Sequence, residues 1–529
     1  MSHDDTPRSP SRRSLVAGLA ATGGLAALLA TPAAEAAADP LTRRLFVEDF
    51  RTTSDQQAWE DAVAACHALT GGAHLIASAP AYDFTAPIDL TGLTNVTIEG
   101  LGADATLLRA DPAMSGSLSR IFKIGGSSDT RNITFRGLGF DGGMTSEPVG
   151  HARDGAQPRP FPSEGYLRTG IFAQGPLDPD TPALGEIDGI TVDRCRFYGL
   201  EHLPVHVNGA RNVVVRDTYF RRCKDVGFTF CHSVQFHHNR IEWSADNGVS
   251  LSRGCREVTC SGNTIAGSFF SGVFAGGFGD DIGPSHLAIV GNTVSDSGIG
   301  GIELTRGTCD TLVQGNVVEG VLRGVGTWNS DGNGPWYGVG IMISGMPLNH
   351  SSSFSSGDQG DYEQLAERNV IVGNLVRNAE RCGILFHGTD HLTVLGNGVH
   401  NAGSEYYIDG VTPIPDDATY RNVGIGAFAP AAGSSTNTTI MTNQITDSRG
   451  GVMTYGIIPR QPSTGMIAGN VIEGAAQTTP EGFPAPVHSS ASRPAASAFP
   501  PGSSIFDTTT NSPLWSDGST WRDASGSPA

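Results

Sequence analysis

The chain has 529 residues, of which 70 are Gly and only 16% are charged, and its formal net charge is −19. Long helices tolerate Gly badly, so the composition excludes a helix-dominated fold. Nucleic-acid binding needs a basic stripe, which a chain this acidic does not suggest, and the same charge disfavours an anionic membrane surface. With 38% hydrophobic residues and 23 Phe, most of the chain is expected to fold.

Residues 1–38 are typical of an export signal. Ser11-Arg12-Arg13-Ser14-Leu15-Val16 precedes an apolar run that ends near Ala30, and small residues follow it. An Arg pair at this place resembles a twin-arginine signal, and an ordinary secretory signal is the alternative. We therefore expect the mature protein to work in the periplasm or outside the cell. No later stretch is apolar enough to predict a membrane span.

A short helix is predicted next. Residues 55–69 place apolar side chains at helical spacing, including Trp59, Val63 and Cys66. Gly71-Gly-Ala-His-Leu-Ile76 follows and has the form of a first strand. The helix therefore comes immediately before the strand-rich part of the chain.

A repeat of about 23 residues runs through most of the remaining sequence. Its pattern is apolar-x-apolar-x-x-Asn-x-apolar, as in Val234–Ile241 and Val258–Ile265. Each unit carries a second strand of the form Gly-apolar-x-apolar, such as Gly248–Leu251. Units this short cannot bury an apolar face alone, so they must stack and share one core. The repeated Asn stands at positions 239, 263, 292, 316, 374, 397, 443 and 470.

Short strands at this period, joined by Gly and Asn turns, resemble the pectate-lyase-like β-helix proteins across about residues 70–475. The resemblance implies an all-β fold, a single-stranded right-handed parallel β-helix of about ten to twelve coils with a short N-terminal capping helix. The repeated Asn would then form a ladder at a tight bend. A β-propeller needs about 40 residues per repeat and fits less well. The family consists mainly of extracellular enzymes that cut or epimerise polysaccharides, which implies a polysaccharide or oligosaccharide substrate.

Four segments are predicted from these patterns. Residues 1–38 form the signal, 39–475 the parallel β-helix domain, 476–504 a Pro/Ser-rich linker, and 505–529 a small C-terminal β-hairpin module. The last segment resembles the ends of phage tail proteins and of secreted β-helix proteins. This resemblance points to assembly or attachment and leaves a homotrimer open.

Candidate catalytic residues follow from stacking, because equivalent side chains on successive coils lie about 4.8 Å apart. Alignment on the repeated Gly places His202, Asp225 and Asp246 in one column, and His206 and Glu303 in a second. Two carboxylates roughly 5 Å apart suit a retaining glycosidase, since one pKa rises and that group keeps its proton. A wider pairing of Asp246 with Glu303 would suit an inverting mechanism.

The predicted catalytic residues are therefore Asp225, Asp246 and Glu303. The alternative is that each Asp is a turn residue, since Asp246-Asn-Gly248 also suits a turn. No cofactor is expected; Asp280–Asp281 are considered as Ca²⁺ ligands, with a solvated loop as the simpler interpretation. The predicted substrate-binding residues are Glu201, His202, His206, Trp243, Arg253, Trp328, Trp336 and Tyr337.

Leu200-Glu-His202 and Asp246-Asn-Gly-Val-Ser-Leu251 are similar to segments of the inulin fructotransferases. This similarity implies that Asp246 belongs to an acidic catalytic pair. An Asp-Pro-His-Asp segment, as in alginate epimerases, is absent from the sequence. The leading hypothesis is a secreted enzyme that cleaves or rearranges glycosidic bonds with two carboxylates.

Two alternatives to this hypothesis remain open. One is a polysaccharide lyase or C5-epimerase that acts on a uronate with Arg253 and either His202 or His206. The other is a non-catalytic surface protein that binds glycans, in which the carboxylates are turn residues.

Overall fold

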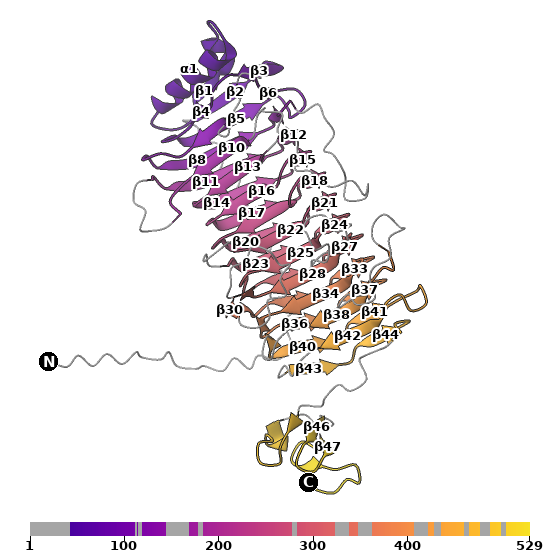
Figure 1. The fold of residues 1–529 in the computed structure, drawn as a ribbon. Helices are drawn as coiled ribbons and strands as arrows, with labels where there is room; N and C mark the ends of the chain where they lie inside the picture. Colours follow the sequence, from indigo (N-terminus) through magenta and orange to yellow (C-terminus); the bar gives the residue numbers. More distant parts are fainter. Residues whose placement is uncertain are drawn as a thin grey trace, which may run out of the picture. The chain divides into compact units, whose positions relative to one another are not determined.

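A computed structural model describes residues 43–111, 114, 119–143, 169–177, 184–200, 202–277, 283–322, 338–347, 362–406, 422–427, 435–459, 465–476, 487–498 and 504–529. Within these ranges the strands form three long parallel sheets, called A, B and C below, of 14, 13 and 12 strands. The chain visits A, B and C in turn and then begins the next coil (Figure 1). The predicted parallel β-helix is confirmed, and its longest sheet has more strands than the ten to twelve expected coils.

The strand bounds are as follows. Sheet A contains β1 (Arg43–Phe46), β2 (Ala73–Ala77), β5 (Thr94–Gly100), β8 (Thr130–Arg136), β11 (Ile187–Asp193), β14 (Ala210–Arg216), β17 (His232–His237), β20 (Arg256–Ser261), β23 (Ser285–Val290), β26 (Leu312–Gln314), β32 (Val370–Val372), β36 (Thr393–Leu395), β40 (Thr438–Met441) and β43 (Gly465–Ala468). Sheet B contains β3 (Ala81–Phe84), β6 (Leu107–Ala110), β9 (Gly139–Asp141), β12 (Arg196–Tyr198), β15 (Tyr219–Arg221), β18 (Arg240–Glu242), β21 (Thr264–Ala266), β24 (Thr293–Ser295), β27 (Val317–Glu319), β33 (Leu375–Arg377), β37 (Gly398–His400), β41 (Gln444–Thr446) and β44 (Val471–Glu473).

Sheet C contains β4 (Ile88–Asp89), β7 (Arg120–Ile124), β10 (Thr169–Gln174), β13 (Val205–Asn208), β16 (Val226–Thr229), β19 (Val249–Ser252), β22 (Val273–Gly276), β25 (Gly300–Thr305), β28 (Val339–Ser344), β34 (Cys382–His387), β38 (Val423–Ala427) and β42 (Tyr455–Pro459). Two small sheets accompany them: β29 (Met346–Pro347) pairs with β30 (Tyr362–Gln364), and β31 (Ala366–Glu367), β35 (Thr389–Asp390) and β39 (Ser435–Thr436) form the other.

The core fills the inside of the coils. In sheets A and B inward and outward side chains alternate, and the inward apolar residues of successive strands form continuous buried columns. Several strands of sheet C, such as β25, β28 and β34, are buried on both sides. The Phe197 ring, for example, stacks on Phe140 with centroids 4.3 Å apart and on Phe220 at 5.0 Å. The shared core explains how units of about 23 residues are stable only when stacked.

The corner between sheets A and B holds the predicted Asn ladder. From β17 onward this corner always has two residues, the first with a left-handed backbone and the second Asn. Asn292 shows the pattern: its backbone N and its Nδ2 both donate to Asn316 Oδ1, each at 2.9 Å. Its Nδ2 also donates to the carbonyl of Cys260 at 2.9 Å. These repeated Asn residues are therefore structural, as the sequence predicted.

The N-terminal end of the solenoid is covered by α1 (Asp55–His67), which follows the 3-10 helix η2 (Val47–Phe50). The Ser54 hydroxyl caps α1 by accepting from the Gln57 N–H at 3.2 Å. Trp59 is fully buried, and its ring lies 5.4 Å from Tyr82 and 5.5 Å from Phe122. The predicted capping helix is confirmed, and it ends two residues earlier than expected.

The last described residues form a four-stranded sheet with a small core of its own. It consists of β45 (Val487–His488), β46 (Ser504–Asp507), β47 (Ser512–Ser516) and β48 (Trp521–Arg522), and the 3-10 helix η4 (Ala496–Ala498) lies between β45 and β46. Ala496, Ile505, Leu514 and Trp521 make up its core. The structured segment therefore begins inside the range predicted as a linker, because β45 pairs with β46.

The predicted export signal lies outside the described residues. Among the residues that the structure describes, no helix has the length and apolar character needed to cross a membrane.

Candidate active site

The candidate site lies at the corner that leads from sheet B to sheet C. This corner has four residues between β15 and β16 but six between β18 and β19. Val226 consequently pairs with Val249, and Gly227 pairs with Ser250. Asp225 therefore occupies the place that Gly248 takes in the next coil. The predicted alignment, which matched Gly227 with Gly248, is wrong by two residues at this coil.

Asp225 is an exception at its position. Gly stands there in the following coils, and a Cβ added to Gly248 would lie 2.5 Å from the Gly272 carbonyl oxygen. Asp246 is in the predicted column with Phe270 and Ile299: Phe270 N–H donates to the Asp246 carbonyl at 3.1 Å, and Ile299 N–H to that of Phe270 at 2.9 Å. The two Asp residues therefore lie on adjacent coils but at different positions in the corner: Asp225 directly precedes β16, and Asp246 stands three residues before β19.

A hydrogen-bond network joins the two carboxylates. The Ser250 hydroxyl donates to Asp225 Oδ2. Asn247 Nδ2 donates to Ser250 Oγ at 3.2 Å and to Asp246 Oδ1 at 3.1 Å. Lys224 Nζ lies 3.4 Å from Asp246 Oδ2. The two groups therefore share neighbours but have different partners.

These different partners affect the pKa values of the two carboxyl groups differently. Asp225 is 7% exposed, and its burial together with the nearby charge of Asp246 raises its pKa to about 7. Burial also raises the pKa of Asp246, but the Lys224 ammonium and the Asn247 N–H oppose that rise. Asp246 is the better site for the negative charge, and Asp225 keeps a proton near neutral pH.

Glu303 belongs to the same network at greater distance. It lies on β25, in the outward column of Ser250 and Phe274. The Ser271 hydroxyl donates to Glu303, and the Ser271 N–H donates to Asn247 Oδ1 at 3.0 Å. Burial raises the pKa of Glu303 to about 7. Two coil steps separate Glu303 from Asp246, or about 10 Å along the solenoid.

His206 lies in the outward column of Ser250 and Glu303, as the alignment predicted, because it pairs with Gly227 and Gly227 pairs with Ser250. His206 and Arg253 both line a cleft of about 350 Å³, together with Asn208, Thr229 and Ser252. Asp246 precedes β19 and Arg253 follows it. A four-residue strand spans about 13 Å, so the two residues lie at opposite ends of that length. The structure therefore separates Arg253 from the acid pair, Asp225 and Asp246, and keeps His206 one coil step from Gly227.

The charge of Lys224, which lies beside Asp246, also acts on His206. Burial lowers the pKa of His206 to about 4, and the charges of Lys224 and Arg120 act in the same direction. Its ring lies 5.9 Å from that of His202. His206 is consequently a neutral imidazole at pH 7.

Trp243 is the first residue after β18 and is 38% exposed, three positions before Asp246. Other predicted residues lie outside the described ranges: Glu201, Trp328, Trp336, Tyr337 and the Asp280–Asp281 pair. In the described part of the chain, no group of three or more His, Cys, Asp or Glu side chains is arranged to hold a metal ion.

Three members of the network were not predicted as site residues: Asn247, Ser250 and Ser271. Asn247 was visible only as half of an Asn-Gly turn. Ser250 stood in the predicted column of Glu303 without a role, and Ser271 carries no sequence signal. Their roles depend on which coil positions face one another.

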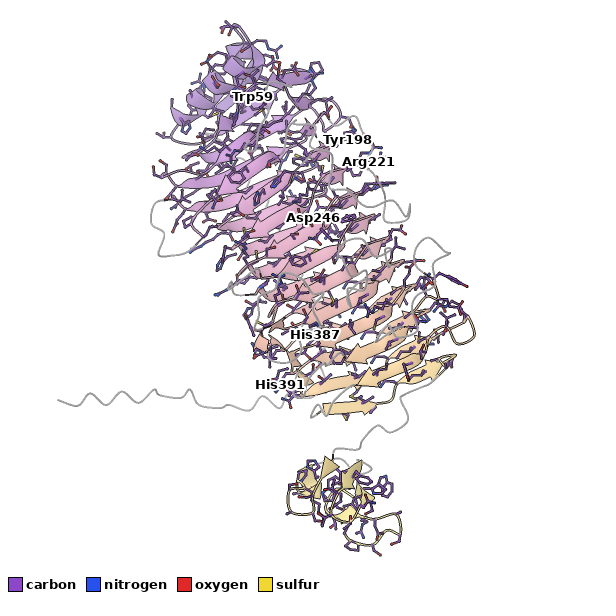
Figure 2. The ribbon with its side chains drawn as sticks, in the orientation of Figure 1. Trp59, Tyr198, Arg221, Asp246, His387 and His391 are labelled. Carbon is purple, nitrogen blue, oxygen red and sulfur yellow. The ribbon has the colours of Figure 1, made fainter. Side chains whose placement is uncertain are left out.

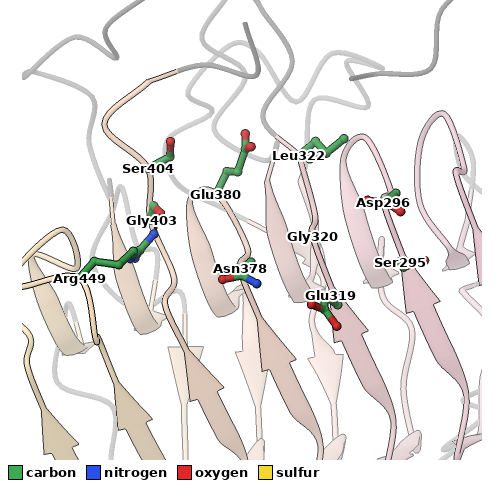
Figure 3. A pocket seen from close by; sticks show the side chains of 10 residues that line it. All are labelled: Ser295, Asp296, Glu319, Gly320, Leu322, Asn378, Glu380, Gly403, Ser404 and Arg449. Atoms are coloured by element: carbon green, nitrogen blue, oxygen red, sulfur yellow. Dashed lines mark hydrogen bonds between the residues drawn. The ribbon is translucent and has the colours of Figure 1, made fainter. Parts of the chain in front are cut away.

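A second cleft, of about 420 Å³, follows the same corner farther along the solenoid (Figure 3). The residues that line it lie at or just after the ends of successive sheet B strands. They include Asp296, Glu319, Leu322, Asn378, Glu380 and Arg449.

Comparisons with known proteins concern the fold. Residues 183–335 match the family model described as a right handed beta helix region. The pre-mature gene product 12 of bacteriophage phi29 has a TM-score of 0.51 and 11% identity, covering 84% of this chain and 59% of that chain. A comparison with curated proteins finds no match.

Two further solved structures are enzymes. The A-module of the mannuronan C-5 epimerase AlgE6 of Azotobacter vinelandii has a TM-score of 0.48 and 18% identity, covering 82% of this chain and 95% of that chain. A DFA-IIIase of Arthrobacter chlorophenolicus A6 in complex with GF2 has a TM-score of 0.46 and 12% identity, with coverage of 82% and 94%. The strand order, the family match and the phage structure together show a right-handed parallel β-helix.

Proposed function

We propose that the protein is an enzyme that acts on glycosidic bonds of a polysaccharide or oligosaccharide, with Asp225 and Asp246 as its catalytic pair. One observation carries the proposal: two buried carboxyl groups on adjacent coils share a hydrogen-bond network but have different partners, Asp225 bonded by Ser250 and Asp246 beside Lys224. Burial and the charge of Asp246 raise the pKa of Asp225 to about 7. Cleavage of a glycosidic bond needs such a pair, one acid and one carboxylate.

The roles follow from these environments. Asp225 gives its proton to the leaving glycosidic oxygen while an Asp246 oxygen forms a bond to the anomeric carbon. Asp225, now ionised, then takes a proton from water, or from an acceptor hydroxyl, as that oxygen displaces Asp246. The two groups stand on adjacent coils and are linked through Asn247 and Ser250. We propose that they act as the close pair, roughly 5 Å apart, of retaining enzymes. The product should therefore keep the anomeric configuration of the substrate.

The test uses Asp225→Asn and Asp246→Asn in the full chain, assayed on a panel of neutral and uronic glycans. We expect kcat to fall about 10²–10⁴-fold in both variants, with thermal stability unchanged or raised. Asp193→Asn is the matched control, because Asp193 is also buried and ion-paired, to Arg136 and Arg216, but on sheet A. Its activity per folded molecule should be unchanged.

Two results would overturn the proposal. Full activity of both variants would remove the acid pair from the chemistry. New ultraviolet absorbance from an unsaturated uronide, in place of new reducing ends or transfer products, would indicate a lyase.

A lyase or epimerase is the second candidate, and the 350 Å³ cleft favours it. A neutral imidazole such as His206 can remove a proton, and Arg253 in the same cleft can face a uronate carboxylate. If this candidate holds, His206→Gln abolishes activity on uronates while Asp225→Asn does not. Binding without any turnover on the panel would instead support a glycan-binding surface protein.

A further inference from the structure

Asn247 lies between the two carboxyl groups of the acid pair and forms a hydrogen bond with each of its polar atoms. Figure 2 shows the place of the neighbouring Asp246, in the middle part of the solenoid. The Asn247 backbone N–H donates to Asp246 Oδ1 at 3.0 Å, and its carbonyl accepts from the Ser244 hydroxyl. Its side-chain amide has three further partners, which belong to Asp246, Ser250 and Ser271. A side chain bonded in this way is held in one orientation.

The backbone of the next coil decides which way this amide points. Ser271 N–H donates to Asn247 Oδ1 at 3.0 Å, and Gly248 N–H donates to the Ser271 carbonyl at 2.9 Å. Turning the amide over would place its NH₂ group against the Ser271 N–H and its oxygen against the carboxylate of Asp246. Nδ2 therefore directs both of its hydrogens to the acid pair and its neighbour, one to Asp246 Oδ1 at 3.1 Å and one to Ser250 Oγ at 3.2 Å.

The direction of the Ser250 hydroxyl follows from this amide. Its oxygen accepts from Asn247, and its hydrogen is donated to Asp225 Oδ2. If Asp225 carried its proton on Oδ2, the buried Ser250 hydrogen would have no acceptor among the described residues, which is unfavourable. Oδ2 is therefore the accepting oxygen, and the proton that Asp225 keeps near neutral pH lies on Oδ1.

The two carboxyl groups consequently differ in the donors that they receive. Asp246 accepts the Asn247 N–H and one amide hydrogen of Asn247, and Lys224 lies beside its other oxygen. The described residues give Asp225 Oδ1 no side-chain hydrogen bond, so this oxygen is left for the substrate. One amide hydrogen of Asn247 thus supports the charge on Asp246, and the other acts through Ser250 on the proton of Asp225.

We propose that Asn247 is the positioning residue of the acid pair: its amide directs the Ser250 hydrogen to Asp225 Oδ2 and so places the acid proton on Oδ1. Asn247 acts only through these neighbours, because an amide has no titratable proton in the accessible range. The inference rests on the proposed function in taking Asp225 as the proton donor to the glycosidic oxygen.

Other ionisable groups also act on the acid pair or its neighbours. Lys224 lies in the same corner, and Glu303 on β25 belongs to the network and is affected by the charge of Arg306. His206 on β13 is neutral at pH 7, and its ring lies 5.9 Å from that of His202. None of these groups is substituted in the test variants, so a change in the acid pair comes from the residue that is replaced.

Infrared spectroscopy tests the inference without a substrate. A protonated carboxyl group has a C=O stretching band, and the band of Asp225 is the one that Asp225→Asn removes at about pH 6, below its pKa of about 7. With the proton on Oδ1, Oδ2 is the carbonyl oxygen, and a hydrogen bond accepted by a carbonyl lowers its stretching frequency. Ser250→Ala should therefore move the band to higher frequency. Asn247→Ala should add a second component at higher frequency, because the proton can then move to Oδ2.

Asn212→Ala is the matched control for these variants. Asn212 Nδ2 donates to the carboxylate of Asp188 at 2.6 Å, but on sheet A, so this substitution should leave the band unchanged. Thermal unfolding of each variant is measured alongside. Ser250→Ala and Asn247→Ala act on the same bond from different residues, so either variant that folds decides the question. A band that stays unchanged in the folded variant would overturn the inference.

The pH dependence of turnover gives a second readout. Asn247→Ala takes a hydrogen bond from ionised Asp246, so the pKa of Asp246 rises. We expect the acid limb of the kcat/KM profile to move up by about one pH unit, which corresponds to a tenfold change in the ionisation equilibrium. A merely structural loss would lower the rate at every pH without moving this limb. Asn212→Ala should leave the profile unchanged.

The two readouts separate this inference from the proposed function. If no glycan of the panel is turned over but the band changes as expected, the placement of the proton by Asn247 stands and the proposed chemistry is wrong. If Asp225→Asn and Asp246→Asn abolish turnover while Asn247→Ala keeps the band and the pH profile of the wild type, the catalytic pair stands and the role of Asn247 is wrong.

Discussion

The two corners on either side of sheet B use polar residues in opposite ways. Between sheets A and B, every corner from β17 onward has two residues, and each Asn repeats the hydrogen bonds of the one before it. Between sheets B and C the corner varies in length, from four residues before β16 to six before β19, and its residues vary as well. Here carboxyl groups are buried with raised pKa values.

The difference separates stability from reactivity. Amides that satisfy one another contribute to stability and have no titratable proton in the accessible range. A buried carboxyl with a raised pKa costs stability when it ionises, and the same property makes it a proton donor at neutral pH. The regular corner therefore supports the fold, while the irregular corner is available for chemistry.

The largest expected effect is a loss of stability when the Asn ladder of the regular corner is interrupted. Asn316→Ala removes the acceptor of two buried N–H groups of Asn292, its backbone N and its Nδ2. The free energy of unfolding should fall by about 3 kcal/mol, since each unsatisfied buried donor costs about 1–3 kcal/mol. Urea unfolding measures this loss, and activity per folded molecule should not change.

Gln314→Ala serves as the control for the ladder, because it lies on the outer side of β26 in the same coil. It should cost under about 0.5 kcal/mol. A ladder variant that lost activity while still fully folded would break the separation between the two corners.

A smaller effect is expected from the cation beside the acid pair. Lys224→Met removes the charge that favours ionised Asp246, so the pKa values of both carboxyl groups rise and the pH optimum moves upward. We expect kcat/KM at pH 6 to fall about tenfold, or about 1.4 kcal/mol. Steady-state rates across pH measure both changes.

The other lysine of the chain is a close control. Lys123 lies 3.3 Å from Asp89 and is 37% exposed, compared with 3.4 Å and 35% for Lys224 and Asp246. Lys123→Met should leave the pH profile unchanged. Equal effects of the two substitutions would mean that Lys224 acts only as a surface ion pair.

The smallest effect concerns how stability depends on pH. Because the pKa of Asp225 is higher in the folded protein than in the unfolded chain, the folded state binds more protons between about pH 4 and 7. This group therefore makes the protein less stable as pH rises through that window. Asp225→Asn should raise Tm at pH 8 relative to the wild type and leave it nearly unchanged at pH 4.

Asp447 should have the opposite effect on how stability depends on pH, because its pKa is lowered in the folded protein. Burial would raise its pKa, but bonds from Met453 N–H and Arg449 outweigh burial and hold the pKa below its ordinary value. Its contribution is present above the ordinary pKa of Asp and is lost as pH falls through the lower, folded value. Asp447→Asn should therefore lower Tm at pH 7 and have less effect in acid. A wild-type Tm that rose between pH 4 and 7 in step with Asp225 ionisation would contradict the proton assignment.

The regular corner is the reason that the fold could be predicted. A two-residue turn with Asn in second place keeps the period visible in the sequence, as at Asn263 and Asn292. The capping helix was visible from the spacing of Trp59, Val63 and Cys66. The C-terminal boundary was less clear, because β45 is a two-residue strand in a Pro- and Ser-rich segment.

The site could be predicted only in part, because its corner breaks the period. Asp225 and Asp246 were both found as candidates, and Asp246 keeps its predicted position, but the four-residue corner before β16 moves Asp225 to the place of Gly248. Asn247 and Ser250 join them through contacts between coils, which spacing along one coil does not show. Arg253 was predicted to lie beside the carboxylates because the sequence alignment did not take into account that β19 separates Arg253 from Asp246.

The short corner before β16 also shows how such a molecule can change during evolution. Each strand is held in place by the strands of the coils before and after it, so two codons can be lost from a corner without displacing a strand. A deletion confined to the corner leaves the strand register unchanged, as the pairing of Val226 with Val249 shows, so every strand residue stays on its own side of the sheet. One in-frame deletion can then bring together two acids that no single substitution would join. In this architecture, new reactive pairs can arise from changes of loop length as readily as from changes of residue.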